Sequence, residues 1–212
     1  MKYTPKQEEE LMTDIWSINI KDSPLNFVRY IFPWGQENTP LEDFTGPREW
    51  QEKILRDIGN HIRKNETIDM PEMFRLAVAS GRGIGKSALV AWIILWMLST
   101  RLGSTIIVTA NTEQQLKSRT WAELGKWLTL SINGHWFIKT ATSLKPQPWF
   151  EELLVRDLSI DCGYYYAQQQ LWSADSPDSF AGSHSFLGCM LIMDEASGID
   201  KNIFSVSEGF FT

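Results

Sequence analysis

The stretch of sequence that decides the fold is Ser80-Gly81-Arg82-Gly83-Ile84-Gly85-Lys86-Ser87. It matches the P-loop pattern G-x-x-x-x-G-K-[ST], except that Ser80 replaces the first glycine. The remaining glycines let the backbone turn successive N–H groups inward, and a following helix offers its positive end to phosphate oxygens. Lys86 is then placed to reach the β- and γ-phosphates, and the Ser87 hydroxyl to bind Mg²⁺. The whole loop is therefore predicted to bind ATP together with Mg²⁺.

The segments around this loop have the order that such a site requires. Residues 74–79 alternate in apolar character at the strand period and lead directly into the loop, and residues 86–101 are predicted to form a helix that ends before Gly103. A β-branched run at 105–109 is followed by helical spacing over 112–130. This alternation favours a parallel sheet covered by helices and reached through right-handed crossovers, the α/β fold of a P-loop NTPase (ASCE/RecA-like).

A second strand further along the chain ends in two carboxylates. The apolar run at 189–193 is followed at once by Asp194 and Glu195, which is the pattern of a Walker B strand. Asp194 is predicted to bind the Mg²⁺, and Glu195 to orient and deprotonate an attacking water. This pair favours hydrolysis over phosphoryl transfer to a small molecule, because a kinase would exclude water and need an acceptor pocket instead.

Two further side chains are candidates on chemical grounds. Gln51, on a helix predicted from Pro47 to Ile58, has an amide that can pair with the edge of adenine, or it can be an ordinary exposed glutamine. Arg82 can stabilise charge on the γ-phosphate, or it can form a surface ion pair.

The rest of the chain gives weaker patterns. Residues 1–45 are expected to form a small N-terminal helical appendage, and residues 46–212 the P-loop ATPase domain. Residues 138–142 and 164–171 are compatible with strands or with irregular structure. Residues 173–185 are rich in Ser, Asp, Pro and Gly, which is typical of a loop.

From about residue 45 onward, the chain resembles the N-terminal ATPase domain of the large terminase subunit of tailed bacteriophages, a motor that packages double-stranded DNA. The resemblance rests on five stretches: Pro47-Arg48-Glu49-Trp50-Gln51, the loop at 80–87, Thr109-Ala110-Asn111-Thr112-Glu113-Gln114-Gln115, Phe180-Ala181-Gly182-Ser183-His184 and Asp194-Glu195-Ala196-Ser197-Gly198-Ile199.

This resemblance implies particular roles for the matching residues. Gln51 would contact adenine, Arg82 and Lys86 phosphate, Ser87 and Asp194 the Mg²⁺, and Glu195 would be the catalytic carboxylate. It also implies double-stranded DNA, a small terminase subunit and a portal protein as partners, a ring of identical subunits, and action in the cytoplasm of the host cell. In that family a coupling motif and a nuclease domain follow the stretch similar to 208–212, so the chain is expected to be truncated before them and to lack nuclease activity.

Two other functions fit the same motifs. A helicase or DNA-remodelling ATPase of related fold would act on free nucleic acid without a portal. A nucleotide-binding assembly module would use ATP for conformation alone, but it would not need a base such as Glu195.

The composition of the chain argues against several other classes of protein. The formal net charge of −6 argues against a basic coat over the whole surface for nucleic acid. Cys162 and Cys189 lie far apart without CxxC spacing, and the three histidines are scattered, so we expect neither a disulfide framework nor a metal held by Cys or His. The N-terminus lacks the apolar region of a signal peptide. The apolar run at 88–98 is shorter than the roughly 20 residues that span a bilayer and is expected to be a buried helix, with no membrane partner.

Overall fold

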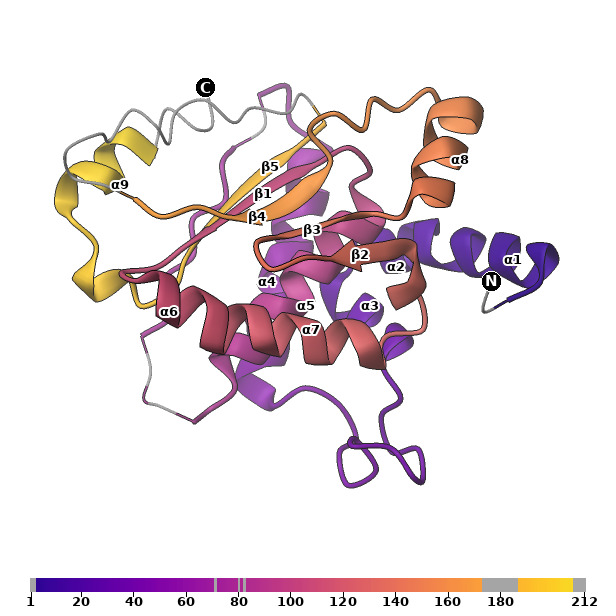
Figure 1. Ribbon diagram of the computed structural model, residues 1–212, viewed down its shortest axis with the longest axis horizontal. Helices are drawn as coiled ribbons and strands as arrows, with labels where there is room; N and C mark the ends of the chain where they lie inside the picture. The colour runs from indigo at the N-terminus through magenta and orange to yellow at the C-terminus, as the bar shows by residue number, and fades with distance from the viewer. Residues whose placement is uncertain (1–2, 71, 80, 82, 173–186, 208–212) are drawn as a thin grey trace.

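The computed structural model describes residues 3–70, 72–79, 81, 83–172 and 187–207. Its centre is a mixed sheet in the order β2-β3-β4-β1-β5, flanked by helices (Figure 1). The strands are β1 (Thr105–Thr109), β2 (Phe137–Lys139), β3 (Ser143–Pro146), β4 (Tyr166–Gln169) and β5 (Cys189–Met193). The helices are α1 (Pro5–Trp16), α2 (Ile18–Lys21), α3 (Pro24–Ile31), α4 (Glu49–Asn65), α5 (Lys86–Thr100), α6 (Glu113–Gln115), α7 (Trp121–Leu130), α8 (Pro148–Leu158) and α9 (Lys201–Ser207).

Strand β1 lies between two parallel neighbours. Its residues pair with β4 on one side and with β5 on the other, where Thr109 is opposite Met193. Ile106 and Val108 point into the main core, whereas Ile107 lies in a smaller cluster on the opposite face. All five residues are buried, as expected for a strand covered on both faces. The α/β class and the two strands predicted at 105–109 and 189–193 are confirmed.

The prediction of a parallel sheet is wrong for two of the four strand pairings among the described residues. β2 and β3 form an antiparallel hairpin, and β3 pairs antiparallel with β4. The connection between β2 and β3 is too short for a parallel crossover, which needs a dozen or more residues. Thr140 stabilises this turn, since its hydroxyl oxygen accepts the N–H of Ser143 at 2.9 Å.

The predicted strand at 74–79 is also absent from the described residues. This segment has no regular secondary structure, and the alternating side chains of Phe74, Leu76 and Val78 are 38–44% exposed. Alternation indicates which side chains suit a core, but a strand also needs a neighbour with which its backbone can pair. Among the described residues β5 pairs only with β1 and forms the edge of the sheet.

Helix α5 is the buried centre of the helical layer. It is apolar on all sides, with residues such as Ile94 and Leu98 fully buried, and it packs on α7. Trp92 of α5 contacts Trp127 of α7 edge-to-face, with ring centroids 4.9 Å apart. In the described part of the chain, no helix is both long and apolar enough to cross a membrane.

The N-terminal helices pack directly against α5. Leu11 and Ile15 of α1 belong to the same core cluster as α5, and the Trp16 indole donates to the carbonyl of Ser99 at 3.0 Å. Arg101, just after α5, pairs with the buried Asp22 at 2.7 Å. Residues 3–45 are therefore fastened to the helical layer by apolar and polar contacts.

Candidate active site

The turn into α5 has the backbone shape that its glycines predict. Gly83 and Gly85 have φ values of +75° and +94°, and Gly85 is the N-cap of α5 without a side-chain hydrogen bond. A Cβ added at Gly81 or Gly83 would meet no atom within 4 Å. Because the N-cap residue Gly85 has no side chain to cap α5, and because the space beside Gly81 and Gly83 is open among the described residues, the turn suits an anion-binding role.

The lysine of the motif folds back over this turn. Lys86 Nζ donates to the carbonyl oxygen of Gly81 at 3.3 Å, and Ser87 is the second residue of α5. Ser80 and Arg82 lie outside the described residues, so the roles predicted for them stay predictions. The same holds for the stretches at 180–184 and 208–212.

The N-terminal end of helix α4 is hydrogen-bonded to the loop. The guanidinium of Arg48 donates to the carbonyl of Ile84 at 3.0 Å, and the side-chain amide of Gln51 donates to the carbonyl of Gly85 at 2.8 Å. The amide oxygen of Gln51 accepts the N–H of Arg48 at 2.9 Å, and Gln51 is only 3% exposed. We call these contacts of Arg48 and Gln51 the α4 clasp. Both ends of the Gln51 amide are engaged by backbone, so its predicted contact with adenine would require these bonds to exchange.

The two carboxylates follow β5 where the parallel strands end. The N–H of Asp194 donates to the carbonyl of Thr109 at 2.8 Å, which continues the β1–β5 ladder by one residue. Glu195 then adopts a left-handed conformation, with φ 53° and ψ 46°. A non-glycine residue in this region costs free energy and is typically kept only where surrounding contacts enforce it.

Side chains from residues 111–120 supply those contacts. The Thr120 hydroxyl donates to Asp194 at 2.5 Å, and Gln115 donates to Glu195 at 2.8 Å. Arg119 forms an ion pair with Glu195 at 2.5 Å, and the Asn111 amide donates to the Glu195 carbonyl at 3.1 Å. We call Gln115, Arg119 and Thr120 the carboxylate-holding set.

The carboxylate-holding set lies at a break in the helix predicted over 112–130. Residues Leu116–Thr120 form a π-helical turn, η1, between α6 and α7. The N–H of Trp121 donates to the carbonyl of Leu116, the i→i+5 bond of such a turn. π-helical turns are rare, and those that interrupt α-helices are frequently found at functional sites.

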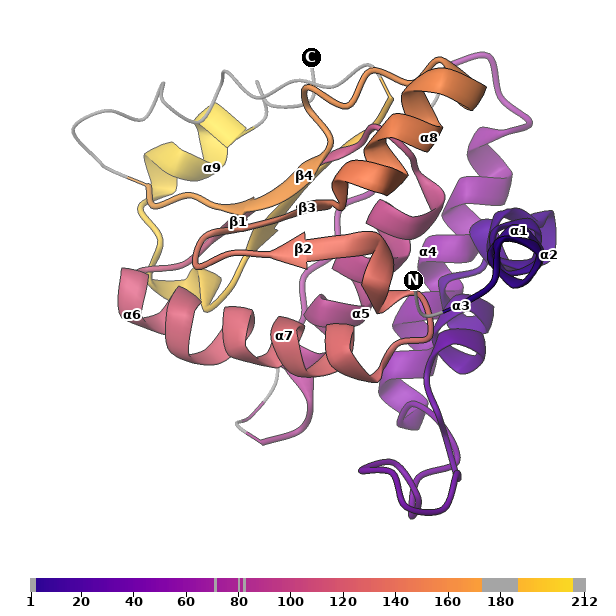
Figure 2. The same ribbon diagram turned by 45° about the vertical axis from the view of Figure 1, so that its right-hand side comes forward.

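The turn that enters α5 and the C-terminal ends of β1 and β5 lie toward the same part of the molecule (Figures 1 and 2). In two views turned by 45°, α6 and the ends of β1 and β5 lie together, and the chain that enters α5 lies below them (Figures 1 and 2). The hydrogen bonds to the two carboxylate groups come from the carboxylate-holding set. No group of three or more His, Cys, Asp or Glu side chains suited to a metal occurs among the described residues.

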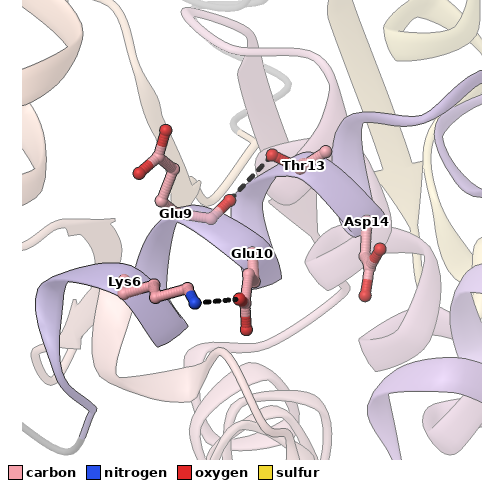
Figure 3. Close-up of a pocket in the computed structure, with 5 residues that line it drawn as sticks. All are labelled: Lys6, Glu9, Glu10, Thr13 and Asp14. Carbon is pink, nitrogen blue, oxygen red and sulfur yellow. Dashed lines mark hydrogen bonds and ion pairs between the residues drawn. The ribbon is translucent and has the colours of Figure 1, made fainter.

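A surface hollow also lies away from these residues, on the N-terminal helix α1. It is a hollow of about 540 Å³ along one face of α1, lined by Lys6, Glu9, Glu10, Thr13 and Asp14 (Figure 3). Its lysine is engaged with Glu10 at 3.9 Å. The three carboxylates of this hollow would repel the negative charge of a nucleoside triphosphate. The hollow is therefore not a candidate for the active site.

Reasoning from the sequence missed the residues that support the site. The stretch at 109–115 resembles a segment of the terminase ATPase, but nothing in its spacing assigns Asn111 or Gln115 to Glu195. Arg119 and Thr120 lie beyond that stretch and match no motif. Comparisons of the chain with models of protein families, with curated proteins and with solved structures gave no match.

Proposed function

We propose that the chain binds and hydrolyses ATP at the loop Gly81–Ser87 and the pair Asp194–Glu195. The observation that carries this proposal is the combination of two features. One is a helix N-terminus whose N-cap residue is a glycine, behind a turn with positive φ values. The other is a Walker B-like strand end whose carboxylates are held by dedicated side chains. A carboxylate in contact with water does not need such partners, because the cost of an unpaired charge arises on burial.

The residues present suit each part of this reaction. Backbone N–H groups at the start of α5 and the ammonium of Lys86 would bind the phosphates. The hydroxyl of Ser87 and the carboxylate of Asp194 are hard oxygen ligands, which Mg²⁺ prefers. Mg²⁺, when bound, neutralises charge on the phosphate oxygens.

Glu195 would provide the base for the chemical step. Its carboxylate takes a proton from water as the water oxygen bonds to the γ-phosphorus. The bond between that phosphorus and the β–γ bridging oxygen breaks, and ADP leaves with the electron pair. The products are ADP and inorganic phosphate.

We further propose that hydrolysis drives translocation of double-stranded DNA into a procapsid, as in the large terminase subunits that the motifs resemble. On this view the chain works as a ring of copies in the host cytoplasm with a portal protein and a small terminase subunit, and Arg82 acts on the γ-phosphate. DNA-stimulated hydrolysis tests this step. Unwinding of free duplex without a portal would instead favour a helicase.

Two variants test the hydrolytic site itself. Lys86→Ala should abolish binding of ATP, measured by fluorescence anisotropy of a labelled analogue, whereas Lys53→Ala, an exposed lysine on α4, should not. Glu195→Gln should keep ATP binding and lower turnover by about 10²–10⁴-fold, the usual contribution of a general base. Glu10→Gln on α1 is its matched control. Unchanged turnover in Glu195→Gln would refute the assignment, and binding without any turnover in the unaltered chain would indicate an assembly module.

A further inference from the structure

We infer that Arg119 is the positioning residue of Glu195, and that the π-helical turn η1 exists to bring it there together with Gln115 and Thr120. This inference rests on the proposed ATP hydrolysis and names the side chains that make its base effective. No motif assigned these three residues to the site.

The π-helical turn explains why three side chains converge. In an α-helix, residues four apart share a face, but a residue five positions on is rotated by about 140° away from it. Gln115 and Arg119 are four apart, and Thr120 is five from Gln115. The i→i+5 bonding of η1 keeps residues five apart on one side of the helix. All three therefore reach the end of β5, where Thr120 meets Asp194 and the other two meet Glu195.

The contacts fix the orientation of the Glu195 carboxylate. Arg119 contacts Oε1, and Gln115 donates to Oε2, so rotation of the carboxylate would break one bond or both. A carboxylate only accepts hydrogen bonds, so the amide nitrogen of Gln115 must be the atom that faces it. The carbonyl of Glu195 is held as well, by Asn111. Side chain and backbone of the proposed base are thus both restrained.

Structural stability alone does not account for this arrangement. The side chains of Arg119 and Glu195 are 52% and 39% exposed, and ion pairs at such exposure contribute little to folding. The surroundings also contain unsatisfied polar groups. Among the described residues, the buried oxygens Thr109 Oγ1, Asn111 Oδ1 and Gln115 Oε1 have no hydrogen-bond partner, although such groups are costly. A cluster that gives up stability to hold a carboxylate in a strained backbone conformation is expected where geometry serves function.

The test compares Arg119→Ala with Lys117→Ala in the whole chain. Lys117 lies in the same turn, but its ion pair is with Glu113, which is not part of the proposed site. Arg119→Ala should lower kcat by about 10–100-fold, as expected when a positioning partner is lost, with the KM for ATP unchanged. Lys117→Ala should leave both constants unchanged. Added guanidinium at low concentration should restore part of the activity of Arg119→Ala, and Arg119→Lys should be less impaired than Arg119→Ala.

The outcomes separate this inference from the proposed function. If the unaltered chain hydrolyses ATP in a manner that depends on Lys86, and Arg119→Ala is equally active or faster, the positioning role is refuted while the ATPase stands. A faster variant would identify Arg119 as a restraint instead. If the unaltered chain does not hydrolyse ATP, the proposed function fails and this inference fails with it. Far-ultraviolet circular dichroism of each variant identifies a loss of activity that comes from unfolding.

Discussion

Replacing Gly85 with alanine should destabilise the chain more than the same change at Gly83, because only Gly85 is pressed against α4. Both glycines have positive φ, which costs an alanine roughly 1–2 kcal/mol. An added Cβ at Gly83 meets nothing within 4 Å, whereas at Gly85 it lies 2.9 Å from Nε2 of Gln51. That atom must shift, and because both ends of the Gln51 amide are already bonded to backbone, we expect the shift to break its hydrogen bond to the Gly85 carbonyl.

The magnitude follows from the burial of Gln51. Its side chain is 3% exposed, so an amide that loses its partner there costs roughly 1–3 kcal/mol. Gly85→Ala should therefore lower the free energy of unfolding by roughly 2–5 kcal/mol in total, and Gly83→Ala by roughly 1–2 kcal/mol. The loss of glycine's flexibility in the unfolded chain is common to both variants and cancels in the comparison.

Urea unfolding followed by tryptophan fluorescence measures both values, and a double-mutant cycle identifies the cause. In a Gln51→Ala background the steric conflict is gone, so Gly85→Ala should cost only the backbone part. Equal destabilisation by Gly83→Ala and Gly85→Ala would refute the α4 clasp, and so would strict additivity of Gln51→Ala with Gly85→Ala.

Three other predictions concern stability, pH and metal. Glu8 is 6% exposed and accepts the Trp136 indole N–H, so Glu8→Ala should lower the free energy of unfolding by about 1.5–3 kcal/mol. Glu9→Ala, on the exposed side of α1, should not change the urea midpoint. Burial and the hydrogen bond to Asp14 raise the pKa of Tyr30 to about 12, above the value of about 10 in an unfolded chain. The stability from the neutral phenol is therefore present below about pH 10 and lost toward pH 12, so the difference in urea midpoint between the unaltered chain and Tyr30→Phe should shrink over that range. Chelation by EDTA should abolish turnover and added Mg²⁺ should restore it; turnover that resists EDTA would contradict the proposed metal site.

The parts of the fold that sequence predicts are those with a local cause. β1 and β5 are short apolar runs next to breakers, and α5 begins at the lysine of a glycine-rich turn. The hairpin of β2 and β3 depends on the pairing of weak strands, which no periodicity specifies. Residues 74–79 show the opposite error, since their alternation suits a strand but the described sheet does not include them.

The candidate site also contains residues that the sequence predicts and residues that it does not. Lys86, Ser87, Asp194 and Glu195 are recognisable because a motif fixes their spacing along the chain. The groups that hold them are distant in sequence: Arg119 lies 76 residues from Glu195. Spacing along the chain cannot reveal such a pair, and the π-helical turn that permits it has no compositional pattern of its own.

The two halves of the site are held by different elements that share one neighbour. The α4 clasp holds the loop through the carbonyls of Ile84 and Gly85, and the carboxylate-holding set comes from η1 and the residue before it. Helix α5 begins at that loop and also packs against η1 and α7. A close-packed buried helix cannot shift at one end without repacking its neighbours. On the proposed function, a movement of the loop that bound nucleotide imposed on α5 would therefore be opposed by η1, the segment whose side chains hold the Glu195 carboxylate.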